Sequence, residues 1–196
     1  MGETIAEDGD RLVRAAKSDR EAFGRLFDRY YPVIHRFCQR RLHPSDGVDD
    51  VTAEVFLAAA RGMPTFPGAT EIDFRCWVFR IAANAANNFV RKQQRRSRLL
   101  GTPADAATVA DGVQASPVET ADEWRRVTAA LERLDERSRT VVTLRYMEQM
   151  NHEDIARVVA ARPAAVRTIL SRALDRLRGL LRVERASVAE SRGGER

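Results

Sequence analysis

Apolar residues recur every three or four positions along most of the chain, which is the spacing of amphipathic helices. In residues 19–41 the recurring apolar positions are Phe23, Leu26, Phe27, Tyr30 and Ile34. Ser18 and Glu21 form a capping box before this helix, and Pro32 predicts a kink or a break inside it. Strand-like alternation and hairpin dipeptides do not appear, so the pattern predicts an all-α fold.

The same spacing predicts two more helices in the first half of the chain. Residues 48–61 form the first, with an inward face of Val51, Val55 and Phe56. The Gly and Pro residues of 62–70 indicate a loop. A long helix is then expected from about 74 to 96.

Residues 97–120 differ from what precedes them, because small residues, Gly, Pro and acids replace the periodic pattern. Such a composition is typical of a flexible linker between domains. Thr120 and Glu123 form a second capping box, after which helical periodicity resumes. The expected divisions are an N-terminal segment, a first helical domain, an acidic linker, a second helical domain and a disordered tail, with bounds 1–18, 19–96, 97–121, 122–182 and 183–196.

Residues 138–181 are expected to form three helices, of which the first covers about Ser138–Met147. The second begins at Asn151, a good N-cap, and the third at Pro163, a favoured first helical residue. The third helix has one apolar stripe, formed by Val166, Ile169, Leu170, Ala173, Leu174 and Leu177. Its other face carries Arg167, Thr168, Ser171 and Arg172. Arginines and small hydroxyl side chains suit the major groove of DNA, so the second and third helices together are a helix-turn-helix candidate. The alternative is that this face of the third helix is merely solvated.

The helix expected at 74–96 interleaves aromatic residues, asparagines and cations. Aromatic stacking beside a track of cations is what binding of single-stranded DNA requires. The spacing favours a core position for Trp77, Ile81 and Phe89. The helix has three asparagines in its middle, Asn84, Asn87 and Asn88. Asparagine is a mediocre helix former, so one or two of the three are expected to have polar roles.

Charge is distributed in blocks along the 196 residues, whose net charge is +5. Residues 43–56 contain four acids and no Lys or Arg, whereas residues 75–98 contain seven bases and no acid. Blocks of opposite sign predict separate faces for separate partners, at least one of them a polyanion. The chain has no secretory signal, no apolar stretch near the roughly 18 residues of a membrane helix, and too few cysteines for a disulfide framework. These features predict a cytoplasmic protein without membrane insertion.

The two halves together resemble the sigma-70 family, specifically the small extracytoplasmic-function (ECF) sigma factors. DREAFGRLFDRYYPVIHRF, DDVTAEVFLAA and WVFRIAANAANNFVRKQQRR resemble domain 2 of that family, and residues 131–178 resemble its domain 4. The resemblance covers about 19–96 and 122–182. It implies an alternative-sigma initiation factor that binds core RNA polymerase and promoter DNA, has no enzymatic activity, and needs no cofactor or metal.

The resemblance also implies roles for individual residues. It implies that Asp49, Asp50 and Glu54 contact a coiled coil of the largest subunit of the polymerase. The melted −10 element is assigned to Trp77, Arg80, Asn84, Asn88, Arg91 and Arg95, with Asn84 lining a pocket for a flipped-out base. The −35 duplex is assigned to Arg167, Thr168, Ser171 and Arg172. The flap of the second-largest polymerase subunit and an anti-sigma factor are the further partners implied.

Several positions depart from the family pattern. Ala53 stands where relatives usually have Gln, and Ala160 where the turn usually has Gly. Ala164 and Ala165 replace a Gly-Thr pair, and Arg162 replaces a small residue or Pro.

Two other classes of function fit these features less well. An enzyme would need a catalytic or metal-binding constellation, but the three histidines lie far apart, and the i, i+3 pair of His35 and Cys38 has no second ligand pair. Glycine-rich phosphate loops and nucleophile elbows do not occur. A simple regulator would use the helix-turn-helix alone and would leave the acidic and Asn-rich segments of the first domain unexplained.

Overall fold

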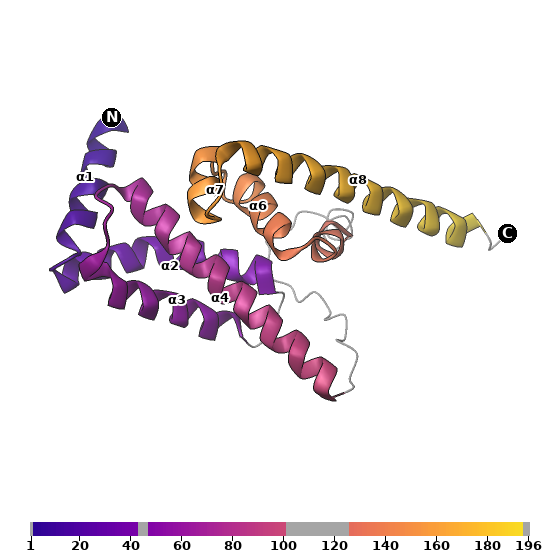
Figure 1. Ribbon diagram of the computed structural model, residues 1–196, viewed down its shortest axis with the longest axis horizontal. Helices are drawn as coiled ribbons and strands as arrows, with labels where there is room; N and C mark the ends of the chain where they lie inside the picture. The colour runs from indigo at the N-terminus through magenta and orange to yellow at the C-terminus, as the bar shows by residue number, and fades with distance from the viewer. Residues whose placement is uncertain (1, 43–46, 101–125, 194–196) are drawn as a thin grey trace.

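A computed structural model describes residues 2–42, 47–100 and 126–193 (Figure 1). These residues contain helices and no strand, which confirms the all-α prediction. The elements are α1 (Gly2–Ala15), α2 (Arg20–Leu42), α3 (Val48–Gly62), the short 3₁₀ helix η1 (Met63–Thr65), α4 (Glu71–Leu100), a helical stretch at 126–132, α6 (Glu136–Tyr146), α7 (His152–Val158) and α8 (Pro163–Gly193). None of the described helices is long and apolar enough to cross a bilayer.

Helices α1 to α4 form the first domain, in which α2, α3 and α4 pack on one another (Figure 1). Its core combines aliphatic and aromatic side chains: Phe37 and Phe79 are fully buried and meet edge to face, with ring centroids 5.3 Å apart. The inward face expected for residues 48–61 is confirmed, because Val51, Val55 and Phe56 are all buried.

The start of the chain differs from the sequence expectation. Residues 2–15 form helix α1, which buries Leu12 and Val13 in the same core, where only an N-terminal segment was expected. The N-cap of α2 is Asp19, not Ser18, because the Asp19 carboxylate accepts the backbone N–H of Glu21 at 2.9 Å. Both residues are good capping types, so the sequence pattern did not separate them.

Helix α2 continues through Pro32, so of the two predicted alternatives, a kink or a break, the break is wrong. Proline removes one backbone hydrogen bond, but buried residues on both sides of it hold the helix against α3 and α4. These residues include Tyr30 before the proline and Ile34 after it.

Helix α4 is longer at both ends than expected. It begins at Glu71 because Thr70 and Asp73 cap each other: the Thr70 hydroxyl accepts the Asp73 N–H at 3.1 Å, and the Asp73 carboxylate accepts the Thr70 N–H at 3.1 Å. The helix runs to Leu100, so residues 97–100 of the expected linker are helical. The rest of that linker up to 121, like the Thr120–Glu123 capping box, lies outside the described residues.

The second domain consists of residues 126–132 and helices α6, α7 and α8. The predicted cap at Asn151 is confirmed, because its side chain accepts the Asp154 N–H at 2.8 Å. Helix α6 begins two residues before the expected Ser138, because Asp135 caps it by accepting the Ser138 N–H at 3.0 Å.

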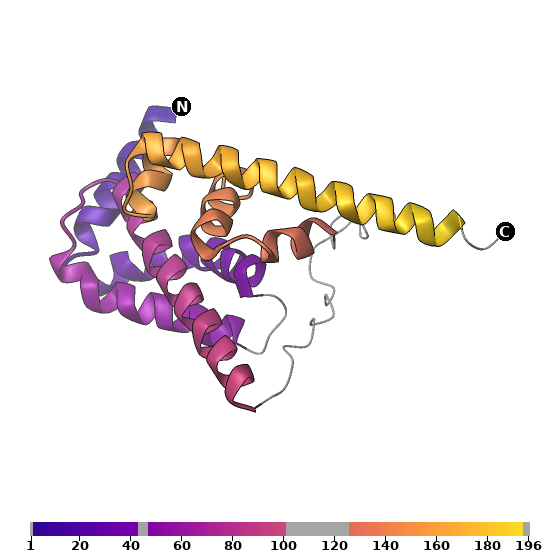
Figure 2. The ribbon, with the colours of Figure 1, turned by 45° about the vertical axis from the view of Figure 1, so that its right-hand side comes forward.

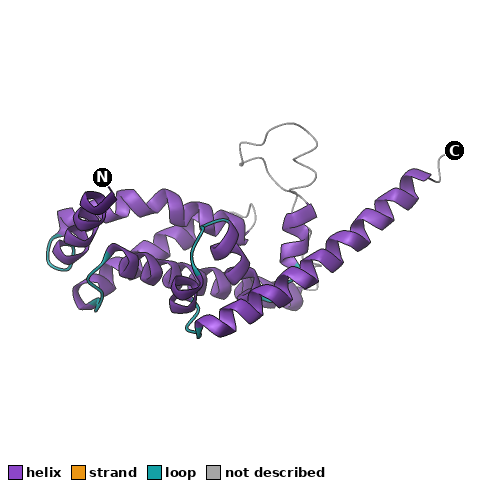
Figure 3. Cartoon of the chain, turned by 90° about the horizontal axis from the view of Figure 1, so that it is seen from above, coloured by secondary structure: helices purple, strands orange, loops and turns teal. Residues whose placement is uncertain are grey.

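Helix α8 begins at Pro163 as predicted and continues to Gly193, well beyond the other helices of its domain (Figure 3). Residues 183–193 were expected to be disordered. They contain no Pro and no Gly before position 193, and extending an established helix costs little because nucleation is already complete.

Ala160 lies in the turn between α7 and α8 with φ of 49°, a left-handed conformation that disfavours side chains with a Cβ atom. Ala160→Gly removes that penalty but adds unfolded-state entropy, so we expect a net gain of about 0.5–1 kcal/mol in unfolding free energy. Ala165→Gly, at an exposed helical position of α8, is the matched control and should destabilise by a similar amount. Urea denaturation measures both; a loss of stability in Ala160→Gly contradicts the prediction.

Candidate functional site

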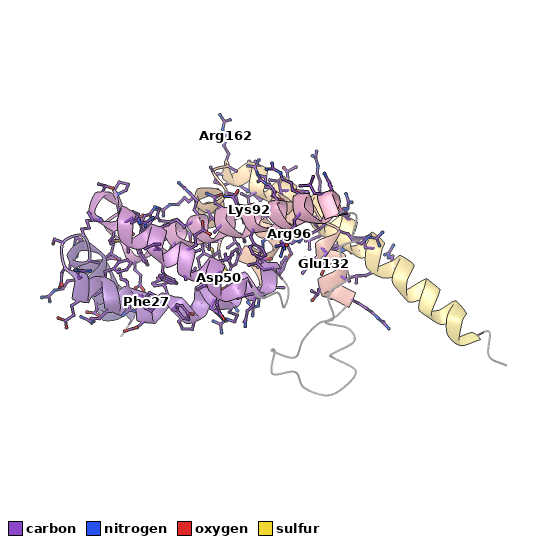
Figure 4. All side chains as sticks on the ribbon, turned by 90° about the horizontal axis from the view of Figure 1, so that it is seen from below. Phe27, Asp50, Lys92, Arg96, Glu132 and Arg162 are labelled. Atoms are coloured by element: carbon purple, nitrogen blue, oxygen red, sulfur yellow. The ribbon has the colours of Figure 1, made fainter. Side chains whose placement is uncertain are left out.

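An acidic face lies on the first half of α3. Asp49, Asp50 and Glu54 are all exposed (Figure 4 labels Asp50). His35 of α2 lies 2.8 Å from Asp49, measured between Nε2 and Oδ1, so Asp49 has a neighbour in the fold while Asp50 and Glu54 face outward. Acids in a first helical turn also interact favourably with the helix dipole.

Apolar residues border this acidic face, and of these the sequence pattern singled out Phe27 alone, as an apolar position of its helix. Leu57 is 52% exposed, and it lies seven residues after Asp50, on the same side of α3. Half-buried Phe27 and Tyr31 of α2 lie nearby, because Phe27 packs on Phe56 of α3 with ring centroids 4.8 Å apart. The sequence did hold a signal for this surface, because helical spacing places the large apolar side chain of Leu57 on the same side as the acids. Acids beside exposed apolar surface are typical of a protein-binding face.

A second face runs along α4. Trp77, Arg80, Asn84, Asn88, Arg91 and Arg95 are separated by three, four, four, three and four residues. That spacing places them on one side of the helix, in a row called here the α4 stripe. Five of the six are exposed, and Trp77 is half-buried. Lys92 and Arg96 add positive charge to the C-terminal half of α4, where Arg91 and Arg95 also lie (Figure 4).

Trp77 has a fixed position at one end of the stripe. Its ring stacks on Phe66, with centroids 4.6 Å apart and planes 27° apart, and Phe66 belongs to the loop that precedes α4. Trp77 also packs toward Phe74, which is fully buried. The ring therefore has one packed face at the rim of the core, intermediate between the core position and the DNA-contacting position expected from the sequence.

The three asparagines of α4 separate into two kinds. Asn87 accepts a hydrogen bond from Arg41 at 2.5 Å, which gives it a polar role within the fold, and the sequence predicted a polar role for one or two of the three. Asn84 and Asn88 are exposed on the α4 stripe. Their amides are thus available to a ligand that follows this side of the helix.

A third face lies on α8. Arg167, Thr168, Ser171 and Arg172 are all exposed, whereas Val166, Leu170, Ala173 and Leu177 on the opposite side are buried. The Thr168 hydroxyl donates to the Ala164 carbonyl at 3.1 Å, and it can still accept a bond from outside. Arg162, in the turn before α8, points away from the body of the molecule (Figure 4).

Two family models match the chain: the model for sigma-70 region 2 matches residues 26–96, and the model for sigma-70 region 4 matches residues 124–177. The chain is 31% identical over 171 residues to the ECF RNA polymerase sigma factor BldN of Streptomyces coelicolor, covering 87% of this chain and 64% of that one. It is 31% identical to the ECF RNA polymerase sigma-E factor of Haemophilus influenzae, covering 84% of this chain and 89% of the relative.

Solved structures show the same arrangement of helices. CnrH, solved in complex with the cytosolic domain of CnrY, has a TM-score of 0.64 at 26% identity, covering 89% of this chain and 97% of CnrH. The sigma factor RpoE of Bartonella quintana, solved with the anti-sigma factor NepR, has a TM-score of 0.64 at 19% identity, covering 82% of this chain and 97% of that one. The second likeness supports the fold alone.

Proposed function

The chain belongs to the sigma-70 family, and from that premise we propose that it is an alternative sigma factor whose three exposed faces contact core RNA polymerase, the melted −10 element and the −35 duplex. The observation that carries this assignment is the separation of an acidic face, a cationic and amide-bearing stripe, and an Arg-rich recognition face on three different helices. A transcription initiation factor of this kind directs promoter choice and catalyses no reaction itself. Its place of action is the cytoplasm, where its polymerase partner is found.

The polymerase contact is assigned to Asp49, Asp50 and Glu54, with the coiled coil of the largest subunit as the partner. Acids at an exposed edge steer a basic partner during approach, and the bordering Leu57 supplies apolar surface that is buried on contact. The flap of the second-largest subunit is the partner assigned to the second domain. An anti-sigma factor would be a further protein partner.

The −35 contact is assigned to α8. A helix that buries one side in its own domain and presents arginines on the other can enter the major groove. An arginine can contact guanine through two hydrogen bonds, while Thr168 and Ser171 can reach a base edge or a phosphate. The side chains proposed for this contact are Arg167, Thr168, Ser171 and Arg172.

The −10 contact is assigned to the α4 stripe. Arg80, Arg91 and Arg95 provide charges along the helix that can follow a phosphate backbone. Trp77, held by Phe66, offers a ring surface on which a base can stack. Extruding a base costs a few kcal/mol of stacking, and hydrogen bonds from Asn84 to that base offset the cost.

The second candidate function is that of a transcription regulator that binds DNA through the helix-turn-helix alone. The two candidate functions are distinguished by adding the purified chain to core RNA polymerase on genomic fragments and sequencing the transcript starts. A sigma factor gives new starts that share upstream −35 and −10 sequences. Fragment binding without any new start contradicts the proposal and favours the regulator.

Arg172→Ala should weaken binding to the preferred −35 duplex by about 1–3 kcal/mol and relax specificity at one base position, because a two-bond contact to one base is lost. Arg178→Ala is the matched control, since Arg178 pairs with Asp175 at 2.7 Å and is not among the residues assigned to DNA. Fluorescence anisotropy on a set of −35 variants measures both effects. Unchanged affinity for every duplex would show that another face of α8 reads the DNA.

A further inference from the structure

We propose that helix α1 positions the ring surface offered to the −10 element, and that it acts through Gly9, Asp10 and Arg14. The inference rests on the function proposed for the α4 stripe, which begins at Trp77. The helix itself was not expected from the sequence pattern. It lies beside the loop of residues 66–70 and the start of α4, and it packs on both α2 and α4 (Figure 1 and Figure 2).

Asp10 caps α4 from a neighbouring helix. The Asp10 carboxylate accepts the backbone N–H of Glu71, the first residue of α4, and its Oδ1 lies 2.7 Å from that nitrogen. The first N–H groups of a helix have no carbonyl partner one turn earlier, so a side chain has to supply one. A carboxylate also interacts favourably with the positive end of the helix dipole. Asp10 thereby ties the first turn of α4 to α1.

The side chain of Glu71 is fixed by two donors of α2. It accepts from the guanidinium of Arg29 at 2.9 Å and from the hydroxyl of Tyr30 at 3.1 Å. Burial and the negative charge of Glu71 raise the pKa of Tyr30, so the hydroxyl remains protonated and able to donate. The start of α4 is therefore bonded to α1 through its backbone and to α2 through its side chain.

Gly9 permits the close approach of α1 to this carboxylate. A Cβ atom at position 9 would lie 1.8 Å from Oε2 of Glu71 and 3.1 Å from its Cβ, so alanine fits there only if one of the two helices shifts. The carboxylate has little room to move aside, because Arg29 and Tyr30 bind it. Glycine is otherwise unfavourable inside a helix, and here it lets the two helices meet.

The loop before α4 is held between α1 and α4. Arg14 of α1 donates to the Ala69 carbonyl, with Nη1 3.4 Å from the oxygen, while the Asp73 carboxylate of α4 accepts the Ala69 N–H at 3.0 Å. Lys17, in the turn after α1, lies over the ring of Phe66 with Nζ 5.8 Å from the centroid, which is within cation–π distance. Both the backbone and the aromatic side chain of the loop thus contact cations at the end of α1.

Phe66 connects this loop to Trp77. The Phe66 ring stacks on the indole with centroids 4.6 Å apart and meets Phe74 edge to face at 6.3 Å. Phe74 is fully buried and also contacts Tyr30, whose hydroxyl binds Glu71, with ring centroids 5.2 Å apart. A loop released from α1 leaves Phe66 free to move off the indole. Trp77 then loses the packed face that fixes its tilt, and with it the orientation of the surface on which a base is proposed to stack.

The first measurement reports on Trp77 in the absence of polymerase and DNA. The full chain carries Trp124→Phe, which leaves Trp77 as its one tryptophan. Asp10→Ala removes the acceptor for the Glu71 N–H, so acrylamide should quench Trp77 fluorescence at least about twofold more efficiently. Asp10→Asn keeps a carbonyl oxygen that can accept the same N–H, so its quenching should match that of wild type.

Gly9→Ala should raise the quenching of Trp77 in the same way, because the added Cβ atom separates α1 from Glu71. Gly24→Ala is the matched control and should leave the quenching unchanged, since no other part of the described chain comes within 4 Å of a Cβ atom at position 24. If Asp10→Ala lowers the helical content measured by circular dichroism, Arg14→Ala, at an exposed position, replaces it with the same criteria.

The second measurement uses the complex of each variant with core RNA polymerase. Its probe is a fluorescein-labelled single strand with the −10 sequence found upstream of the mapped transcript starts. Asp10→Ala should bind this strand about 3- to 10-fold more weakly, because the ring surface is no longer oriented in advance. Asp10→Asn and Gly24→Ala should bind it like wild type. Competition for core enzyme and binding to −35 duplex should be unchanged in every variant, which a general loss of structure would not allow.

Unchanged quenching of Trp77 in both Asp10→Ala and Gly9→Ala overturns the inference, whatever the DNA result. Raised quenching with wild-type binding to the −10 strand also overturns it, because the ring surface would then need no positioning. A wild-type complex that does not prefer the −10 strand over a scrambled strand contradicts the function proposed for the α4 stripe, and the inference is then overturned with it.

Discussion

Reversing the charge of Asp50 and Glu54 together, as Asp50→Arg and Glu54→Arg, is expected to lower affinity for core RNA polymerase at least about 100-fold. Each substitution removes an attraction to a basic surface and creates a repulsion, and like charges facing each other across an interface cost several kcal/mol. The fold should survive, because both side chains are exposed and surface charges contribute little to stability. The unfavourable effect of a cation in the first turn of α3 is a few tenths of a kcal/mol.

The measurement is competition for core enzyme against a labelled sigma factor, with circular dichroism to check helical content. Asp8→Arg with Glu21→Arg is the matched control, since it reverses two exposed acids at the α1 end of the first domain. The wild type should also lose affinity more steeply with added salt than the variant does. Normal competition by a fully helical variant would show that polymerase binds elsewhere.

Helix α8 and its exposed face could be predicted from the sequence because the determinants of this helix are local. Its buried stripe follows helical spacing, and the proline that starts it is itself a helix-start signal. The exposed face of α8 consists of the positions that do not belong to its buried stripe, so helical spacing alone places Arg167 and Arg172 outward. The cap at Asn151 is equally local, because it depends on one side chain and an amide three residues away.

The contact between the domains could not be predicted in this way. Its hydrogen bonds join residues separated by 77 positions for Arg80 and Arg157, and by 108 for Arg40 and Glu148. All of these side chains are of charged types that usually face water, so no periodic pattern marks them. The burial of Arg41 was the hardest feature to predict, because nothing in the sequence distinguishes this buried arginine from the exposed arginines near it.

The choice among the asparagines of α4 illustrates how far helical spacing reaches. Asn84 and Asn88 follow Trp77 by seven and eleven residues and therefore share its side of the helix, whereas Asn87 does not. The structure agrees with that geometry, because Asn87 is used by Arg41 and the other two are exposed. Spacing can thus identify which asparagines of α4 face outward.

Asn84→Ala is expected to lower open-complex formation about 10- to 100-fold on the preferred promoter, because a two-bond contact from its amide to one base is worth about 1–3 kcal/mol. The side chain is exposed and alanine is a better helix former, so folding should be unaffected. Binding to −35 duplex should also be unchanged, since that contact is the one proposed for α8. Permanganate footprinting with core enzyme measures the opening directly.

Gln93→Ala is the matched control for this prediction: it also removes an exposed amide from α4, but Gln93 lies nine residues from Asn84 and therefore on the opposite side of the helix. A promoter with a pre-melted bubble separates reading from melting. On that template the deficit of Asn84→Ala should shrink, because the unstacking cost is already met, while its preference among −10 sequences should still be weaker than that of wild type. If Asn84→Ala opens the intact promoter normally and keeps its −10 preference, Asn84 does not read the extruded base, and Asn88 becomes the remaining amide of the stripe able to do so.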